Sequence, residues 1–295
     1  MIKIDEVVFG DNQFFGINHM SQEKAQQLAE KFYDLDNIIE IYKVAYNLGL
    51  KNYMLNSNER AKDICYYFKK HHKQYPDINW YPSIPYPHKY ANLVSEKGIF
   101  PAISEILFQN NSTLNILSLL KKGGLAFINK DVIKLMQMLI DIEMKMFEGL
   151  NVKVIFLQNI ITDLLLGLNT PDIFKEYCDY IRLKYKVLPG FITQNLPALK
   201  SNFEKWNINE VVICTSFNKI GYLMSPDIDS YVKTISENDS TKYQIMAMST
   251  LASGSINPID AYTFINNHNI QSIVFGASSK KNIEQTLLQI NKKNI

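Results

Sequence analysis

The sequence predicts an α/β fold, a (β/α)8 barrel of the TIM type, and three observations favour it. Short apolar or β-branched runs alternate along 295 residues with segments of helical period. Eight such runs are each followed by helix-forming sequence, which is the order that parallel barrel strands require. The length suits one barrel, so we predict a single domain over residues 1–295. A doubly wound open sheet is the alternative, because one sequence does not reveal strand order.

The expected elements can be placed by their composition. The strands are expected near residues 5–10, 51–56, 78–84, 152–158, 186–191, 210–215, 243–248 and 271–276. A helix over 37–49 has Gly49 where a C-terminal cap belongs, and one over 170–185 begins with Thr170 and Pro171. Residues 88–150 are too long for one connection, so we predict a helical insertion there, between the third and fourth strands.

Charge and composition exclude several classes of protein. The chain has 31 basic and 29 acidic residues, a net charge of +2, so it lacks the basic surface expected for nucleic-acid or membrane binding. No apolar run reaches the roughly 18 residues of a membrane span. Three scattered cysteines and a start without signal-peptide features predict a cytoplasmic protein. We expect its partner to be a small-molecule substrate. The Met-rich helix at 131–149 is either core or the contact surface of a homo-oligomer.

Neutral polar residues dominate the predicted carboxyl ends of the strands, where barrel active sites lie. They suit many hydrogen bonds to a hydroxyl-rich ligand. The candidate substrate-binding residues are Asn12, Gln13, Asn18, Asn56, Gln158, Asn159, Gln194 and Asn218. Clustered carboxylates, histidines or cysteines are missing from this rim, so we predict no metal site built by the protein.

Four residues near the same strand ends are candidates for proton transfer: His19, Glu59, Tyr81 and His88. His19 follows a glycine-bounded loop after the first strand and titrates near neutral pH, although a loop-anchoring role explains it equally well. Glu59 lies in "SNER", which also reads as the start of a helix with a favourable charge in its first turn.

The stretch "IVFGASSKKNIEQTL" predicts an anion site near the C-terminus. An apolar strand ends at Gly276, hydroxyl residues follow, and a helix begins near Lys280. Backbone N–H groups at such a helix start bind phosphate, and TIM barrels often hold phosphate after the seventh and eighth strands. The alternative is an ordinary turn in which Ser278 or Ser279 caps the helix.

These residues resemble the last third of an aldo-keto reductase. Ser249, Leu251, Ala252, Ser253 and Gly254 match the family's "Ser-Pro-Leu-Ala-x-Gly" loop, and Gly276, Ala277, Ser278, Asn282, Ile283 and Leu287 match its last strand and helix. "VVFGDNQFFGI" is similar to its first strand. The resemblance implies a (β/α)8 barrel that binds NADPH without a Rossmann domain. It places the cofactor phosphate at Ser249, Leu251, Ser253, Gly276, Ser278, Ser279 and Asn282.

The family's catalytic Asp-Tyr-Lys-His tetrad has no counterpart at the matching positions. Asn56 stands where the aspartate belongs, Gln158 stands where the histidine belongs, and the third strand offers no lysine. The expected tyrosine is also missing. Asn56 and Gln158 can donate hydrogen bonds but cannot supply a proton at neutral pH.

Three functions therefore remain open, and the cofactor is not fixed by the sequence. The preferred one is a metabolic enzyme that uses non-redox acid/base chemistry on a phosphorylated, sugar-like or nucleotide-like molecule, with its phosphate at the last two strand loops. The second is an NAD(P)H-dependent oxidoreductase with an atypical proton donor. The third is a catalytically silent barrel that binds a ligand.

Overall fold

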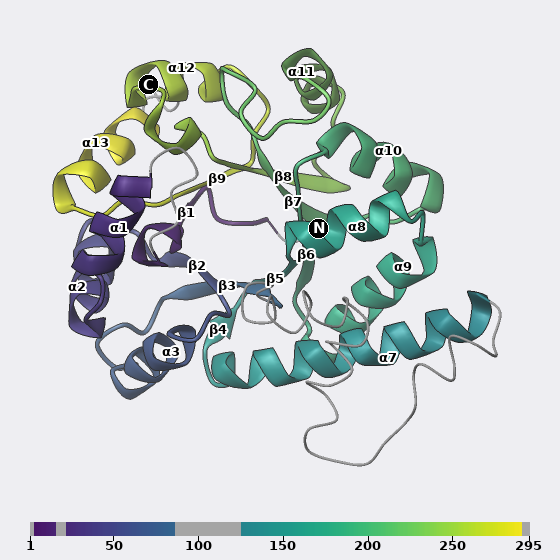
Figure 1. The fold of residues 1–295 in the computed structure, drawn as a ribbon, viewed down its shortest axis with the longest axis horizontal. Coiled ribbons are helices and arrows are strands. Elements are labelled where there is room, and N and C mark those ends of the chain that lie inside the picture. The colour runs from purple at the N-terminus through teal and green to yellow at the C-terminus, as the bar shows by residue number, and fades with distance from the viewer. Residues whose placement is uncertain (1–2, 16–21, 86–124, 291–295) are drawn as a thin grey trace.

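The computed structural model describes residues 3–15, 22–85 and 125–290, and within these ranges the chain forms a closed parallel barrel (Figure 1). The strands are β1 (Val7–Phe9), β2 (Asn52–Asn56), β3 (Asn79–Ile84), β4 (Asn151–Val152), β5 (Val154–Leu157), β6 (Leu188–Thr193), β7 (Val211–Ser216), β8 (Tyr243–Met248) and β9 (Ser272–Phe275). All pairings are parallel, and the order β2-β1-β9-β8-β7-β6-β5-β3 is closed by the pairing of β2 with β3. The predicted barrel is confirmed.

The short strand β4 and strand β5 together form the fourth strand position of the eight-stranded barrel. Both pair with β3, β4 through Asn79 and Trp80 and β5 through Ser83 and Ile84. Lys153 between them donates its backbone N–H to the carbonyl of Trp80 at 2.9 Å, so the chain stays on the same path. The nine strands of the described residues therefore fill the eight strand positions that the sequence predicts.

Helices surround the ring of strands (Figure 1). They are α1 (Gln22–Lys31), α2 (Leu35–Asn47), α3 (Ala61–Lys70), α7 (Leu125–Met144), α8 (Asn159–Gly167), α9 (Pro171–Tyr180), α10 (Leu196–Trp206), α11 (Ile228–Ser236), α12 (Pro258–Asn266) and α13 (Lys280–Ile290). Gly49, at φ 89°, follows α2, and Thr170 and Pro171 start α9, as expected. The predicted insertion contributes α7, while residues 86–124 lie outside the described ranges.

Alternation along each strand divides the core into two layers. Inward-facing residues fill the barrel, among them Val8, Met54, Tyr81 and Phe156. Outward-facing residues pack against the helices in a larger cluster that includes Phe9 and Tyr53. The predicted strands are thus buried on both faces, which is why they read as nearly continuous apolar runs.

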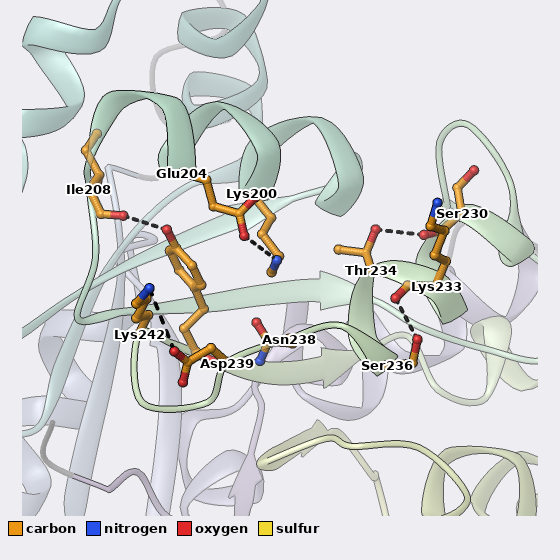
Figure 2. A network of polar contacts seen from close by, with 11 residues as sticks. Lys200, Glu204, Ile208, Ser230, Lys233, Thr234, Ser236, Asn238, Asp239 and Lys242 are labelled. Atoms are coloured by element: carbon orange, nitrogen blue, oxygen red, sulfur yellow. Dashed lines mark hydrogen bonds and ion pairs between the residues drawn. The ribbon is translucent and has the colours of Figure 1, made fainter.

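The amino ends of β7 and β8 carry a polar network that joins the barrel to α10 and α11 (Figure 2). Tyr243, at the start of β8, donates its hydroxyl to the carbonyl of Ile208 at 2.9 Å. Lys200 is almost buried and pairs with Glu204 at 2.6 Å, and its ammonium group lies 5.7 Å from the centre of the Tyr243 ring. These contacts are at the end of the barrel opposite to the predicted site, where polar groups serve stability.

The absence of a side chain at Gly190 leaves space for the ring of Phe156 inside the barrel. A Cβ atom at this position of β6 would lie 2.5 Å from the ring of Phe156 and 2.7 Å from the side chain of Val154. Both neighbours face the barrel interior, where close packing allows little relaxation.

We therefore expect Gly190→Ala to lower the free energy of unfolding by about 1–3 kcal/mol through overpacking. Gly167→Ala is the matched control, because a Cβ there meets no atom within 4 Å; it should be neutral or slightly stabilising. Urea unfolding of the two variants measures the difference. Equal stability of both would contradict this account of the barrel interior.

Candidate active site

The inward-facing side chains at the carboxyl ends of β2, β3 and β5 form a connected polar layer above the apolar barrel core. Gln158 Nε2 donates to Asn56 Oδ1 at 2.6 Å and to Ser83 Oγ at 2.8 Å. Ser83 is fully buried and Gln158 nearly so. Hydrogen bonds between neutral groups thereby join the ends of β2, β3 and β5, at the end of the barrel where active sites form.

Asp11 adds a buried carboxyl group to this layer. It follows β1 directly, and its Oδ2 accepts the backbone N–H of Asn56 at 2.8 Å while its Oδ1 accepts Asn56 Nδ2 at 2.6 Å. Asn12 also approaches Asn56 Nδ2, at 3.3 Å. Burial raises the pKa of Asp11 to about 7, although the hydrogen bonds from Asn56 act in the opposite direction. The site therefore contains a carboxyl group that exchanges its proton near neutral pH.

The loop that carries Asp11 is fixed by Gln13 and two glycines. Gln13 Nε2 donates to the carbonyl of Gly10 at 2.8 Å, and Gly10 donates its N–H to the carbonyl of Phe275 at 2.8 Å. The amide of Gln13 lies directly against Gly276, where a Cβ would come within 2.0 Å of Gln13 Oε1. A side chain at position 276 would therefore displace the amide of Gln13, which links the loop after β1 to the end of β9.

Two of the four predicted proton-transfer residues, Tyr81 and Glu59, lie in the described structure, and neither faces the polar layer. Tyr81 faces into the barrel, but its hydroxyl donates to Asp5 Oδ2 at 2.5 Å, at the amino end of the barrel. Glu59 is exposed in the loop before α3, where Asn58 Oδ1 caps the helix by accepting the N–H of Ala61 at 3.0 Å. His19, His88 and the substrate-binding candidate Asn18 lie outside the described residues.

The remaining amide candidates play different parts. Gln194 is partly exposed at the end of β6; its N–H donates to Asp163 Oδ2 at 3.0 Å, and Asp163 also accepts the hydroxyl of Thr193. Asn159 is partly exposed at the start of α8. Asn218 is fully buried, and both atoms of its amide bond the backbone of Tyr222 at 2.8 Å. Asn218 therefore builds the loop after β7.

The loop after β8, which belongs to the predicted cofactor-phosphate set, has an unusual backbone. Ser249, Ala252 and Ser253 all have positive φ, a conformation that costs energy outside glycine and is frequent at functional sites. Ser249 Oγ accepts from Ser216 Oγ at 3.3 Å, and Ser253 Oγ donates to the hydroxyl of Tyr222 at the same distance. Leu251 packs beside Ala252 in a small separate cluster and is half-buried.

The start of α13 collects positive charge near the end of β9. Ser279 Oγ caps the helix by accepting the N–H of Asn282 at 3.3 Å, so the capping alternative holds for this residue. Lys31 at the end of α1 donates its ammonium group to the carbonyl of Ser278 at 2.7 Å. Lys280 and Lys281 form the first turn of the helix. Lys280 also pairs with Glu284 at 3.7 Å. The lysines and the helix N-terminus together make the start of α13 electropositive.

The sequence places Asp11 and Ser83 near strand ends but gives neither a role, and it does not point to Lys31. Asp11 is an isolated acid next to the first predicted strand. Its importance comes from burial and from Asn56, 45 residues away. Lys31 reaches a loop 247 residues further along the chain, a contact that no local pattern contains.

The described residues contain no group of three His, Cys, Asp or Glu side chains arranged to hold a metal ion. None of the helices in these ranges combines the length and the hydropathy that a bilayer span requires.

Comparison with known proteins identifies the barrel type through structure and not through sequence. No protein-family model matches the chain, and no curated protein sequence is significantly similar to it. A protein described as an aldo-keto reductase from Pseudomonas aeruginosa superposes with a TM-score of 0.63, over 99% of this chain and 92% of that chain, at 7% identity. A structure described as a 2,5-diketo-D-gluconic acid reductase B gives 0.55, over 97% and 82%, at 8% identity.

A third solved structure is the holo form of an aldo-keto reductase from Bacillus halodurans. It superposes with a TM-score of 0.50, over 97% of this chain and 86% of that chain, at 11% identity. At such identities the likeness establishes the fold. The chain is an aldo-keto-reductase-like (β/α)8 barrel over nearly its whole length.

The raised pKa of Asp11 predicts a specific pH dependence of stability. The native state holds the proton up to about pH 7, whereas the ordinary pKa is 3.8, so the native state binds more protons in between. The free energy of unfolding should then fall as pH rises from about 4 to 7, by at most about 4 kcal/mol. Urea unfolding of the wild type and Asp11→Asn across this range isolates the effect, because the contributions of other groups cancel. Parallel curves would contradict it.

Proposed function

We propose that the chain is an NAD(P)H-dependent oxidoreductase of the aldo-keto reductase type that reduces a carbonyl group on a small molecule. The observation that carries the proposal is the buried Asp11 carboxyl, bonded twice to Asn56 at the carboxyl end of the barrel. It offers a proton donor that the residues at the positions matching the tetrad do not provide. The likeness of fold over nearly the whole chain favours this function over the non-redox one preferred from sequence.

Carbonyl reduction needs a hydride at carbon and a proton at oxygen. Bound NAD(P)H supplies the hydride. Asp11 holds its proton near neutral pH and gives it to the developing alkoxide, which becomes the product hydroxyl. The two N–H groups of Asn56 then stabilise the carboxylate that is left, and water returns the proton after turnover.

The loops after β8 and β9 are the proposed cofactor site. Lys31, Lys280 and Lys281 would hold phosphate oxygens at the start of α13, together with the hydroxyl of Ser278. The loop containing Ser249, Leu251 and Ser253, with its positive φ angles, would pass along the other side of the phosphates. Gly276 and Asn282 complete the set that the resemblance implies.

One observation favours the non-redox function. Asn56 and Gln158 occupy two tetrad positions and are bonded to each other, so both are engaged as neutral groups. Asp11 would serve as a general acid for such chemistry as well, on a phosphorylated or sugar-like molecule held at the same loops. His19 and His88 remain predictions for proton transfer in either case.

Turnover with NADPH separates these functions. We expect oxidation of NADPH in the presence of simple aldehydes such as glyceraldehyde or a nitrobenzaldehyde, and a fall in kcat of about 10²–10⁴-fold in Asp11→Asn, because the proton donor is lost. Asp179→Asn, an exposed acid on α9, is the control and should keep full activity. Absorbance of NADPH measures the reaction. Failure to bind NADPH would leave the non-redox or binding function.

The cofactor site is tested separately by Lys31→Met. Loss of the ammonium group should raise the Kd for NADPH about tenfold, the usual effect of one charged hydrogen bond. Lys242→Met is the control, because Lys242 lies in the loop before β8 at the amino end of the barrel. Fluorescence titration measures both. An unchanged Kd in Lys31→Met would remove Lys31 from the site.

A further inference from the structure

Tyr42 lies directly behind the loop that carries Asp11. It is fully buried on α2, and its ring packs against Phe9 at 6.0 Å and Phe14 at 5.1 Å between ring centres. Phe9 and Phe14 flank Asp11 in the chain, and the N–H of Phe14 donates to the carbonyl of Asp11 at 2.9 Å. Tyr42 thus contacts both sides of the short turn that presents the carboxyl group.

The hydroxyl of Tyr42 is a buried polar group without a hydrogen-bond partner among residues 3–15, 22–85 and 125–290. Such groups are rare in folded proteins, because the hydroxyl has lost its water and gained nothing in return. A second buried atom in the same condition is Nδ2 of Asn58, two residues after the partner of Asp11. Buried polar atoms that lack a protein partner are commonly satisfied by an internal water.

The charged and titratable groups around the Tyr42 hydroxyl single out Asp11. Burial raises the pKa of Tyr42, and the charge of Asp11 raises it further, ahead of Tyr53 and Cys65. Tyr53 on β2 already donates its hydroxyl to the carbonyl of Tyr42 at 3.1 Å. Burial raises the pKa of the Cys65 thiol on α3 to about 12, so it stays neutral. Asp11 is the group in this set that can become charged at neutral pH.

We propose that one internal water joins the Tyr42 hydroxyl to the Asp11 carboxyl, and that Tyr42 is a positioning residue for the proton that Asp11 holds. Asn58 Nδ2 is available as a third partner of this water. The link stabilises the carboxylate left after proton transfer. This inference rests on the proposed role of Asp11, but it concerns a hydrogen bond that exists without substrate or cofactor.

The test compares Tyr42→Phe with Tyr53→Phe. Both tyrosines are fully buried in the same aromatic cluster and their rings lie 4.9 Å apart, but the Tyr53 hydroxyl already has its own partner. The pKa of Asp11 is read from ¹³C NMR of labelled carboxyl groups in the full chain, with Asp11→Asn to assign the signal. We expect Tyr42→Phe to raise this pKa by about one unit, because the carboxylate loses a donor, and Tyr53→Phe to leave it unchanged. The same shift in both variants, or none in Tyr42→Phe, overturns the proposal.

A high-resolution crystal structure of the wild type keeps the proposal testable if Tyr42→Phe does not fold. It should show a water about 3 Å from both the Tyr42 hydroxyl and an Asp11 oxygen, and well-ordered density without that water overturns it. Neither measurement depends on turnover. A shifted pKa in a chain that does not oxidise NADPH would retain the water link and reject the reductase function. If turnover depends on Asp11 but Tyr42→Phe leaves the pKa of Asp11 unchanged, the reductase function is retained and the water link is rejected.

Discussion

The pair of hydrogen bonds between Asp11 and Asn56 is the interaction on which the candidate site depends. Both carboxyl oxygens of Asp11 face N–H groups of one residue, at 2.6 and 2.8 Å, in a place that water hardly reaches. Burial favours the protonated carboxyl and the N–H donors favour the carboxylate. Because the two effects oppose each other, the proton is held near neutral pH without being locked in place.

The barrel holds this pair from three sides. Gly10, Gln13 and Gly276 fix the turn after β1 to the end of β9, and a side chain at position 276 would displace Gln13. Gln158, directly after β5, donates to Asn56 Oδ1, and the same amide group also donates to Ser83 Oγ on β3. The hydrogen-bonded partners of Asp11 in this layer are neutral amide groups, and a second carboxyl group, Asp163, lies at the end of β6. In the proposed function, Asp11 supplies the proton and the amide groups of this layer stabilise the charge that develops.

The fold followed from the sequence because each barrel strand is buried on both faces and each helix has one apolar face. Strand β8, for example, occupies the residues 243–248 that its pattern predicts. The polar rim was predicted too, since strand ends share one edge of a barrel. The sequence pattern does not show where a side chain points or how far it reaches. Tyr81 is predicted near the carboxyl end of its strand, yet its side chain reaches Asp5 at the amino end of the barrel.

Asp11 shows the second limit of the sequence. A lone acid beside a strand looks ordinary until burial and a partner on the next strand alter its pKa, and both depend on packing. Lys31 is similar, because α1 brings it to the loop after β9. Residues whose function comes from such long-range contacts cannot be read from local composition, whereas Asn56 and Gln158 could be placed at the site by their strand position alone.

The central claim is that Asp11 keeps a proton in the folded chain near neutral pH. Infrared difference spectroscopy between wild type and Asp11→Asn, recorded as the pH rises from 5 to 9, observes that proton on the carboxyl group itself. The account predicts a protonated-carboxyl band that is absent from the variant and disappears with a midpoint near pH 7. A carboxylate band already present at pH 5, with no protonated band, would contradict it.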